Sequence, residues 1–245
     1  MTASTASILV PGVLFVATLI RSSLGFGEAL VAVPVLALLI PVNVAAPVAV
    51  MASITVALIV IAQDWRKVYA GTAVRLVLPT LLGIPLGLMV LRAGAESVVK
   101  GALALVILVF SAYSLLAGQQ RQLKDDRFAW LFGFGAGVLG GAYGMNGPPL
   151  ALYGSLRGWS PQHFRATLQG YFLPASVAGL CGYWLAGLCT STVSRLYLWS
   201  LPLVIVATFL GRAINARIGA ARFVRYVHGG LIAIGFVLLS QAFVR

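Results

Sequence analysis

The sequence is organised around one short stretch, Arg21-Ser22-Ser23-Leu24-Gly25-Phe26-Gly27-Glu28. It places an arginine, a glutamate and two glycines, which break helices, between apolar runs at 6–20 and 29–40. A helix that crosses the hydrocarbon core needs roughly 20 residues, so each of these shorter runs predicts a half-helix. Two half-helices joined by a broken tip are a common way for membrane transporters to place a polar site inside the bilayer.

The composition is that of a membrane protein. Hydrophobic residues make up 60% of the 245 residues and charged residues only 9%, whereas about 25% of residues are charged in soluble domains. The net charge of +12 comes from basic residues scattered singly at the ends of apolar runs. This scatter predicts cytoplasmic loops and attraction to anionic lipid, not binding to nucleic acid. We therefore expect a multi-pass protein of the cytoplasmic membrane with membrane lipid as a partner.

Apolar segments of two lengths predict an all-α polytopic fold. Six segments are long enough to cross the bilayer as helices, namely 44–62, 74–91, 98–117, 164–190, 195–211 and 226–244. The weaker runs form two pairs, each interrupted by glycines, and they are 6–20 with 29–40 and 128–139 with 148–156.

An internal repeat accounts for this pairing. Pro34-Val35-Leu36-Ala37-Leu38 corresponds to Pro149-Leu150-Ala151-Leu152-Tyr153, and Gly87 corresponds to Gly211. We divide the chain into a first repeat at 6–118, a cytoplasmic linker at 119–127 and a second repeat at 128–244, all in one membrane domain. Each repeat is expected to hold a re-entrant helical hairpin followed by three transmembrane helices. Because three crossings are an odd number, the two repeats should be inverted relative to each other.

The basic residues also predict the orientation. If the loop at 63–75 is cytoplasmic, most Lys and Arg residues fall in cytoplasmic loops, and the basic residues left outside are Arg92, Lys100, Arg195 and Arg245. Both termini are then expected outside. A returning hairpin and two full crossings would give the same charge distribution, so only the short lengths of the paired runs favour the hairpin.

The second broken tip is Gly140-Gly141-Ala142-Tyr143-Gly144-Met145-Asn146-Gly147-Pro148-Pro149. A proline loses no hydrogen bond in the first turn of a helix, so a half-helix should begin at Pro148 or Pro149. Each tip then directs free N–H groups and the positive end of a helix dipole toward the centre, which favours an anion. The expected substrate-binding residues are Arg21, Ser22, Ser23, Gly25, Gly27, Ser53, Gly141, Gly144, Asn146, Gly147 and Gln169.

The glycines also admit a purely structural interpretation. Gly133, Gly137 and Gly141 recur at four-residue steps, as do Gly83 and Gly87, and such spacing brings membrane helices close together. For Gly83 and Gly87 we expect tight packing alone. For the tips, packing is the alternative to a role in binding.

Arg21 requires a partner, because a central arginine costs about 3 kcal/mol on membrane-insertion scales. Glu28 follows just across the glycine turn. One interpretation is a static ion pair that fastens the tip. The other is that Arg21 attracts the anion while Glu28 takes up a proton when the anion enters or leaves, and the two interpretations are compatible.

These motifs resemble those of the TauE/SafE family of sulfite exporters. The resemblance rests on Gly25-Phe26-Gly27 followed by Val33-Pro34-Val35-Leu36-Ala37-Leu38-Leu39, and on Gly140-Gly141, Gly144 and Gly147-Pro148-Pro149. It covers nearly the whole chain and implies transport of small sulfur-containing or carboxylate anions, such as sulfite, organosulfonates and thiosulfate. Glu28 departs from the family's first motif, which usually continues with another small residue. An acid beside an anion site favours proton coupling or a different substrate.

Three classes of function follow from these observations. We expect a secondary transporter for a small sulfur-containing anion that works by alternating access, with a transporter or channel for small carboxylates or inorganic anions as the alternative. An enzyme is disfavoured because the sequence has no cluster of His, Cys or carboxylate residues, and we expect no metal or other cofactor. A non-transporting membrane subunit would not explain two glycine-broken tips. A homodimer is compatible with the sequence, which does not itself determine an oligomeric state.

Overall fold

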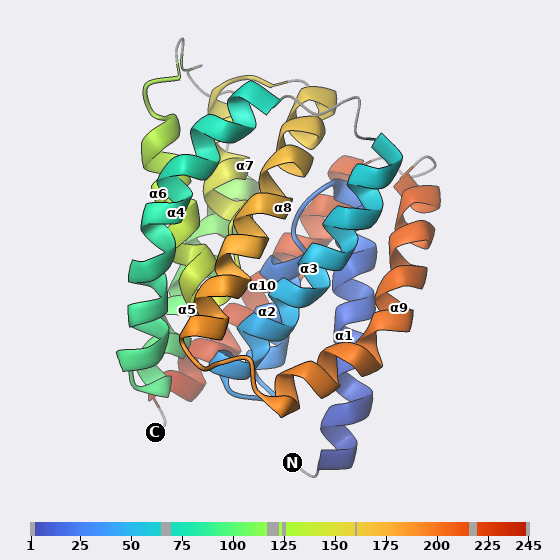
Figure 1. The fold of residues 1–245 in the computed structure, drawn as a ribbon, viewed down its shortest axis with the longest axis vertical. Coiled ribbons are helices and arrows are strands. Elements are labelled where there is room, and N and C mark those ends of the chain that lie inside the picture. The colour runs from blue at the N-terminus through green and yellow to red at the C-terminus, as the bar shows by residue number, and fades with distance from the viewer. Residues whose placement is uncertain are drawn as a thin grey trace.

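The computed structural model describes residues 3–64, 70–116, 123, 126–159, 161–215 and 220–243 (Figure 1). These residues form helices only, with no strand among them, as the composition predicts. The helices are α1 (Ala3–Leu24), α2 (Glu28–Ala37), α3 (Val42–Asp64), α4 (Ala70–Ala93), α5 (Glu96–Leu116), α6 (Ala129–Tyr143), α7 (Gly147–Leu156), α8 (Pro161–Leu185), α9 (Ser191–Asn215) and α10 (Ala220–Phe243).

The two helical hairpins lie at opposite ends of the molecule, and each begins and ends at its own end. α1 begins and α2 ends at the lower end of Figure 1, whereas α6 begins and α7 ends at the upper end. The predicted first arm, 6–20, is too short, because α1 spans 22 residues and continues through Arg21 to Leu24. The helix can continue because buried polar partners, described below, satisfy the arginine. The other arms are short, with 10 residues in α2, 15 in α6 and 10 in α7.

Four of the six predicted crossings are long and apolar enough to span a membrane within the described residues. They are Val42–Gln63, Gly71–Ala93, Glu96–Leu116 and Ser191–Ala213. The other two, in α8 and α10, include positions whose side chains lie outside the described part of the structure, and they stay predictions. α1 begins and α10 ends at the lower end of Figure 1, so both ends of the described chain lie on one side of the fold. That this side is the outside stays a prediction.

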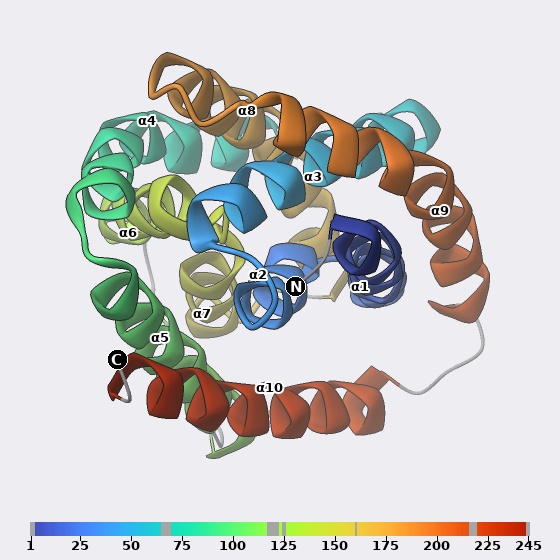
Figure 2. The same ribbon diagram turned by 90° about the horizontal axis from the view of Figure 1, so that it is seen from below.

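The outer helices form an apolar ring. Seen from below, α4, α8, α9, α10 and α5 surround α1, α2 and α7 (Figure 2). Large apolar side chains on the ring are exposed, among them Met89 on α4, Leu105 on α5, Phe209 on α9 and Phe236 on α10. In water such a surface would be costly, whereas lipid tails solvate it. The ring therefore matches a multi-pass membrane protein.

Glycines bring the two hairpins into close contact with the ring. α4 packs along α6, where a Cβ added at Gly137 would lie 2.2 Å from the Thr80 carbonyl oxygen on α4. α9 packs along α1, where a Cβ added at Gly211 would lie 2.8 Å from the Leu19 carbonyl oxygen. Gly83 and Gly87 likewise face the backbone of α6, which confirms the packing role predicted for them. α5 packs on α10, and α3 on α8.

The α4–α6 contact provides a test of the fold. Gly137→Val should lower the midpoint of thermal unfolding in detergent, because overpacking costs about 1–3 kcal/mol and the facing atoms are backbone. Gly135→Val on the same helix is the matched control, since a Cβ there has no neighbour within 4 Å. Equal melting temperatures for the two variants would contradict the described contact.

Candidate functional site

The first tip is a tight turn between α1 and α2 that requires glycine. Gly25 and Gly27 have φ angles of 90° and 101°, a left-handed region that side chains with a Cβ rarely adopt. The Gly25 N–H donates a hydrogen bond of 2.6 Å to the Arg21 carbonyl oxygen. The turn brings Glu28, at the start of α2, back beside the last turn of α1.

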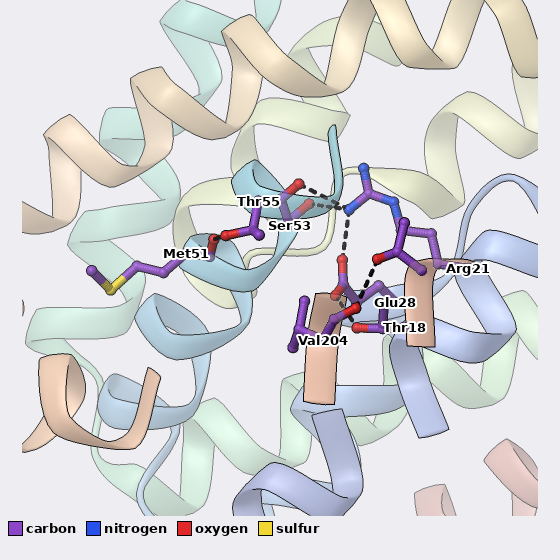
Figure 3. Close-up of polar contacts among 8 residues, drawn as sticks. Thr18, Arg21, Glu28, Met51, Ser53, Thr55 and Val204 are labelled. Carbon is purple, nitrogen blue, oxygen red and sulfur yellow. Dashed lines mark hydrogen bonds and ion pairs between the residues drawn. The ribbon is translucent and has the colours of Figure 1, made fainter. Parts of the chain in front are cut away.

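Arg21 is buried and held by two partners. Its Nη1 donates to Glu28 Oε2 at 2.6 Å and to Ser53 Oγ at 2.5 Å, and it lies 3.2 Å from the Ser53 carbonyl oxygen. Figure 3 shows the guanidinium reaching from α1 toward Ser53 on α3, with Glu28 on its other side. The predicted pair of Arg21 and Glu28 is thus present in the structure. Ser53, expected from the sequence to bind substrate, also contacts Arg21.

Both oxygens of the Glu28 carboxylate have partners. Oε2 accepts from Arg21, and Oε1 accepts a hydrogen bond of 2.6 Å from Thr18 Oγ1. Thr18 is fully buried and was missed from the sequence. Its position three residues before Arg21 was the available signal, because residues three apart share one face of a helix.

One nitrogen of the Arg21 guanidinium has no hydrogen-bond partner. Nη2 is buried without an acceptor. The whole of Arg21 is only 3% exposed. The Phe172 ring lies over the guanidinium, with its centroid 4.9 Å from Cζ. The ring shields the charge from lipid without accepting its hydrogen bonds. An unsatisfied cationic donor in an apolar protein is costly, so this nitrogen is the natural point of attachment for an anionic ligand.

The second tip joins α6 to α7. Gly144 ends α6 with a φ of 67°, and α7 begins at Gly147 with Pro148 and Pro149 in its first turn, as predicted. Asn146 lies just before α7, where its Nδ2 donates to the Tyr171 hydroxyl at 3.3 Å. The first turn of α7 contains no acidic residue, so the positive end of its helix dipole is not neutralised. Pro148 and Pro149 have no N–H, which leaves Gly147 as the backbone donor of this turn.

The two tips meet at a small cavity. Its volume is about 20 Å³, which is room for about one water molecule. The lining comes from both tips and from α3 and α8, and consists of Arg21, Gly27, Glu28, Ala29, Leu30, Ser53, Gly144, Met145, Asn146, Gly147, Phe172 and Ser176. Seven of the residues proposed from the sequence are thus together, namely Arg21, Gly27, Glu28, Ser53, Gly144, Asn146 and Gly147.

Four other predicted residues do not line this cavity. They are Ser22, Ser23, Gly25 and Gly141. Ser22 and Ser23 face α9, where Ser23 Oγ lies 3.3 Å from the Gly211 carbonyl oxygen. Gly141 packs against the Ile84 carbonyl on α4. Gly25 shapes the turn instead. Gln169 belongs to α8, and its side chain lies outside the described residues.

Gln169 predicts a contribution from α8, but Phe172 and Ser176 of the same helix were not predicted. Phe172 and Ser176 sit in a long apolar segment where neither residue type stands out. In the described part of the chain, no three His, Cys, Asp or Glu residues lie together in a way that could hold a metal ion. The cavity therefore offers donors for an anion: one guanidinium, hydroxyl and amide groups, and backbone N–H groups.

Comparison with known proteins assigns the family. The sequence model described as "Sulfite exporter TauE/SafE" matches residues 10–238. The chain belongs to the TauE/SafE family. It is 28% identical, over 181 residues, to a protein of Cupriavidus necator named "Probable sulfite/organosulfonate exporter TauE", and the match covers 73% of this chain and 70% of that protein. No solved structure gives a significant match.

Membership of TauE/SafE confirms several expectations. The family consists of membrane exporters, so the chain is a transport protein and not an enzyme. Its apolar helices agree with a multi-pass location in a membrane. The exporter family also implies a small anionic substrate.

The buried ion pair provides a test by double substitution. Arg21→Met alone should strongly destabilise the protein, because removing one partner of a buried pair costs about 3–5 kcal/mol. Arg21→Met combined with Glu28→Gln should recover much of that loss, since no buried charge is left unpaired. Thermal unfolding of the two single variants and the double variant measures the coupling. Additive losses would show that the two side chains do not interact.

Proposed function

We propose that this TauE/SafE protein carries a small sulfur-containing anion, such as sulfite, an organosulfonate or thiosulfate, across the cytoplasmic membrane. The observation that carries the proposal is the buried guanidinium of Arg21, whose Nη2 has no partner beside a cavity formed by two helix tips. The anion would accept from Nη2 and from the backbone N–H of Gly147, since Pro148 and Pro149 in the first turn of α7 have no N–H. Ser53 and Asn146 would add polar contacts.

The inverted repeat is part of this proposal. The two hairpins begin at opposite ends of the molecule (Figure 1). Each hairpin packs on a ring helix of the other repeat. α4 of the first repeat packs on α6 of the second repeat, and α9 of the second repeat packs on α1 of the first repeat. Gly87 and Gly211, equivalent in the proposed repeat, each lie in one of these contacts. A site between inverted repeats suits alternating access, in which one bundle tilts against the other.

The described conformation corresponds to a closed site. A cavity of about 20 Å³ has no room for an oxyanion with four or more heavy atoms, since one water molecule already fills about this space. Binding therefore requires the tips to separate. The glycine turns at Gly25, Gly27 and Gly144 provide backbone joints at which this separation can occur.

Charge balance supports proton coupling through Glu28. Arg21 and Glu28 together have no net charge, so a monoanion that enters adds one uncompensated negative charge in an apolar environment, which is costly. Protonation of Glu28 restores neutrality and releases Nη1 of Arg21 for the anion. We infer that one proton accompanies each monoanion and returns to solution when the anion leaves and Glu28 again pairs with Arg21.

The alternative is a transporter or channel for small carboxylates or inorganic anions, since their oxygens present the same acceptors to Arg21. Flux that saturates with concentration and responds to a proton gradient favours a carrier over a channel. A role as a non-transporting subunit would not explain why Nη2 of Arg21 is buried without a partner.

Binding is tested by a thermal-shift screen of the purified protein with sulfite, thiosulfate, sulfonates, sulfate and small carboxylates. A sulfur oxyanion should raise the melting temperature of the wild type, because a ligand that binds only the folded state stabilises it. Arg21→Ala should lose this shift, whereas Arg92→Ala, at an exposed arginine outside the cavity, should keep it. A wild type that no anion stabilises, or an Arg21→Ala that responds fully, would refute the site.

Proton coupling is tested in liposomes that contain the protein. Glu28→Gln keeps the shape of the side chain but cannot gain or lose a proton, so uptake should lose its dependence on pH and on an imposed proton gradient. Glu96→Gln, at an exposed carboxylate on α5, serves as the control and should keep both. Unchanged pH dependence in Glu28→Gln would remove the proton role while leaving anion transport intact.

A further inference from the structure

A second and much larger cavity lies at the lower end of the molecule in Figure 1. Its volume is about 830 Å³. It is lined by the turn that follows α2, the start of α5 and the end of α10, through Leu38, Leu39, Ile40, Pro41, Glu96, Ser97, Lys100, Ser240 and Gln241. Figure 2 shows these elements together, with α2 central and α5 and α10 in the ring. The cavity is therefore positioned beside the first hairpin.

Lys100 is the one cation among the described residues that line this cavity. Its side chain is only 13% exposed, whereas that of its partner Glu96 is 44% exposed. Lys100 Nζ lies 2.9 Å from Glu96 Oε1. The ammonium group is thus held inside while the carboxylate is free to turn toward solvent. The central site has a similar arrangement, because Arg21 is also a buried cation paired with a carboxylate, that of Glu28. In the proposed function an anion can replace that carboxylate.

A hydrogen bond links residues that neighbour the larger cavity and the central site. Lys100 follows Val99, whose carbonyl oxygen accepts a hydrogen bond of 3.1 Å from the Tyr143 hydroxyl. Tyr143 immediately precedes Gly144, which lines the central cavity. Along the first hairpin, the two cavities are separated by the 10 residues of α2, which is about 15 Å of helix. Tyr143 and α2 thus lie between the two cavities.

The opposite end of the molecule holds a cluster of polar contacts around Asp126. Asp126 accepts a hydrogen bond from the Tyr153 hydroxyl at 2.7 Å and from Arg75 Nη1 at 2.8 Å, and it lies 3.1 Å from Arg157 Nε. The Tyr153 hydrogen bond and the nearby guanidinium groups lower the pKa of Asp126, so its charge persists at neutral pH. The end of the linker is therefore fastened across α4 and α7.

We propose that the larger cavity is the vestibule through which the transported anion passes between the central site and the lower face, and that Lys100 binds the anion transiently there. The ligand is the same small sulfur oxyanion, so this inference rests on the proposed function. Displacement of Glu96 from Lys100 gives the anion a partner before Tyr143 and α2 move. Ser97 supplies a hydroxyl group beside it.

The test compares Lys100→Gln with Arg92→Gln in proteoliposomes. Arg92 is also basic and close to the start of α5, but it lines a groove between α4 and α8 instead of this cavity. Vesicles in one orientation are selected through a tag at one terminus, and initial rates of sulfite transport are measured from each face. Lys100→Gln should raise the half-saturating sulfite concentration about fivefold or more at the face that carries the termini, and Lys100→Arg should restore it.

Binding measured separately distinguishes this inference from the proposed function. Lys100→Gln should keep the Arg21-dependent thermal shift with sulfite in detergent, which also shows that the variant is folded. An unchanged half-saturating concentration, or an equal change in Arg92→Gln, would overturn the vestibule. A wild type that neither binds nor transports sulfite would instead refute the proposed function.

A lipid headgroup could offer the same anionic chemistry to Lys100. The Lys100→Gln effect is therefore measured in vesicles of phosphatidylcholine alone and in vesicles that also contain phosphatidylglycerol. An effect of the same size in both supports the transported anion as the ligand. An effect confined to phosphatidylglycerol vesicles would assign the cavity to lipid and overturn the inference.

Discussion

The structure depends on how a buried guanidinium is accommodated among apolar helices. Arg21 is only 3% exposed, so the protein must supply its partners. Glu28 and Ser53 satisfy Nη1, and Thr18 in turn satisfies the second oxygen of Glu28. These contacts tie α1, α2 and α3 together at the first glycine turn. They leave Nη2 free, and that remaining donor gives the site a use beyond holding the tip.

The static and the functional interpretations of the Arg21–Glu28 pair therefore concern the same contact. In the described conformation the carboxylate occupies the position of an anion beside the guanidinium, so it acts as an internal substitute for the substrate. In the proposed mechanism this pair stabilises the closed site and must be broken before transport can proceed. Protonation of Glu28 breaks the pair at a small cost in free energy, because neutral Glu28 can remain buried whereas an unpaired carboxylate cannot.

Much of this could be predicted from the sequence, because glycine, proline and charge have local consequences. The broken tips, Pro148 and Pro149 in the first turn of α7, and the pairing of Arg21 with Glu28 all follow from such rules. The length of α1, and the neighbours that Ser22, Ser23 and Gly141 contact, could not be predicted from such rules. They depend on the phase of each helix relative to distant partners. Consecutive residues of a helix point about 100° apart, so Ser22 and Ser23 turn toward α9 once α1 continues through them. Phe172 and Ser176 come from α8, and nothing local brings that helix to the tips.

The central claim is that an oxyanion binds between Arg21 and the start of α7. Selenite has the shape and charge of sulfite and contains an atom heavy enough to locate by anomalous diffraction. Crystals of the wild type grown with selenite should show an anomalous peak within hydrogen-bonding reach of Arg21 Nη2 and of the Gly147 N–H at the start of α7, with the tips further apart than in the closed site. An empty central site in crystals that hold selenite elsewhere, with Arg21 still paired only to Glu28 and Ser53, would contradict the account.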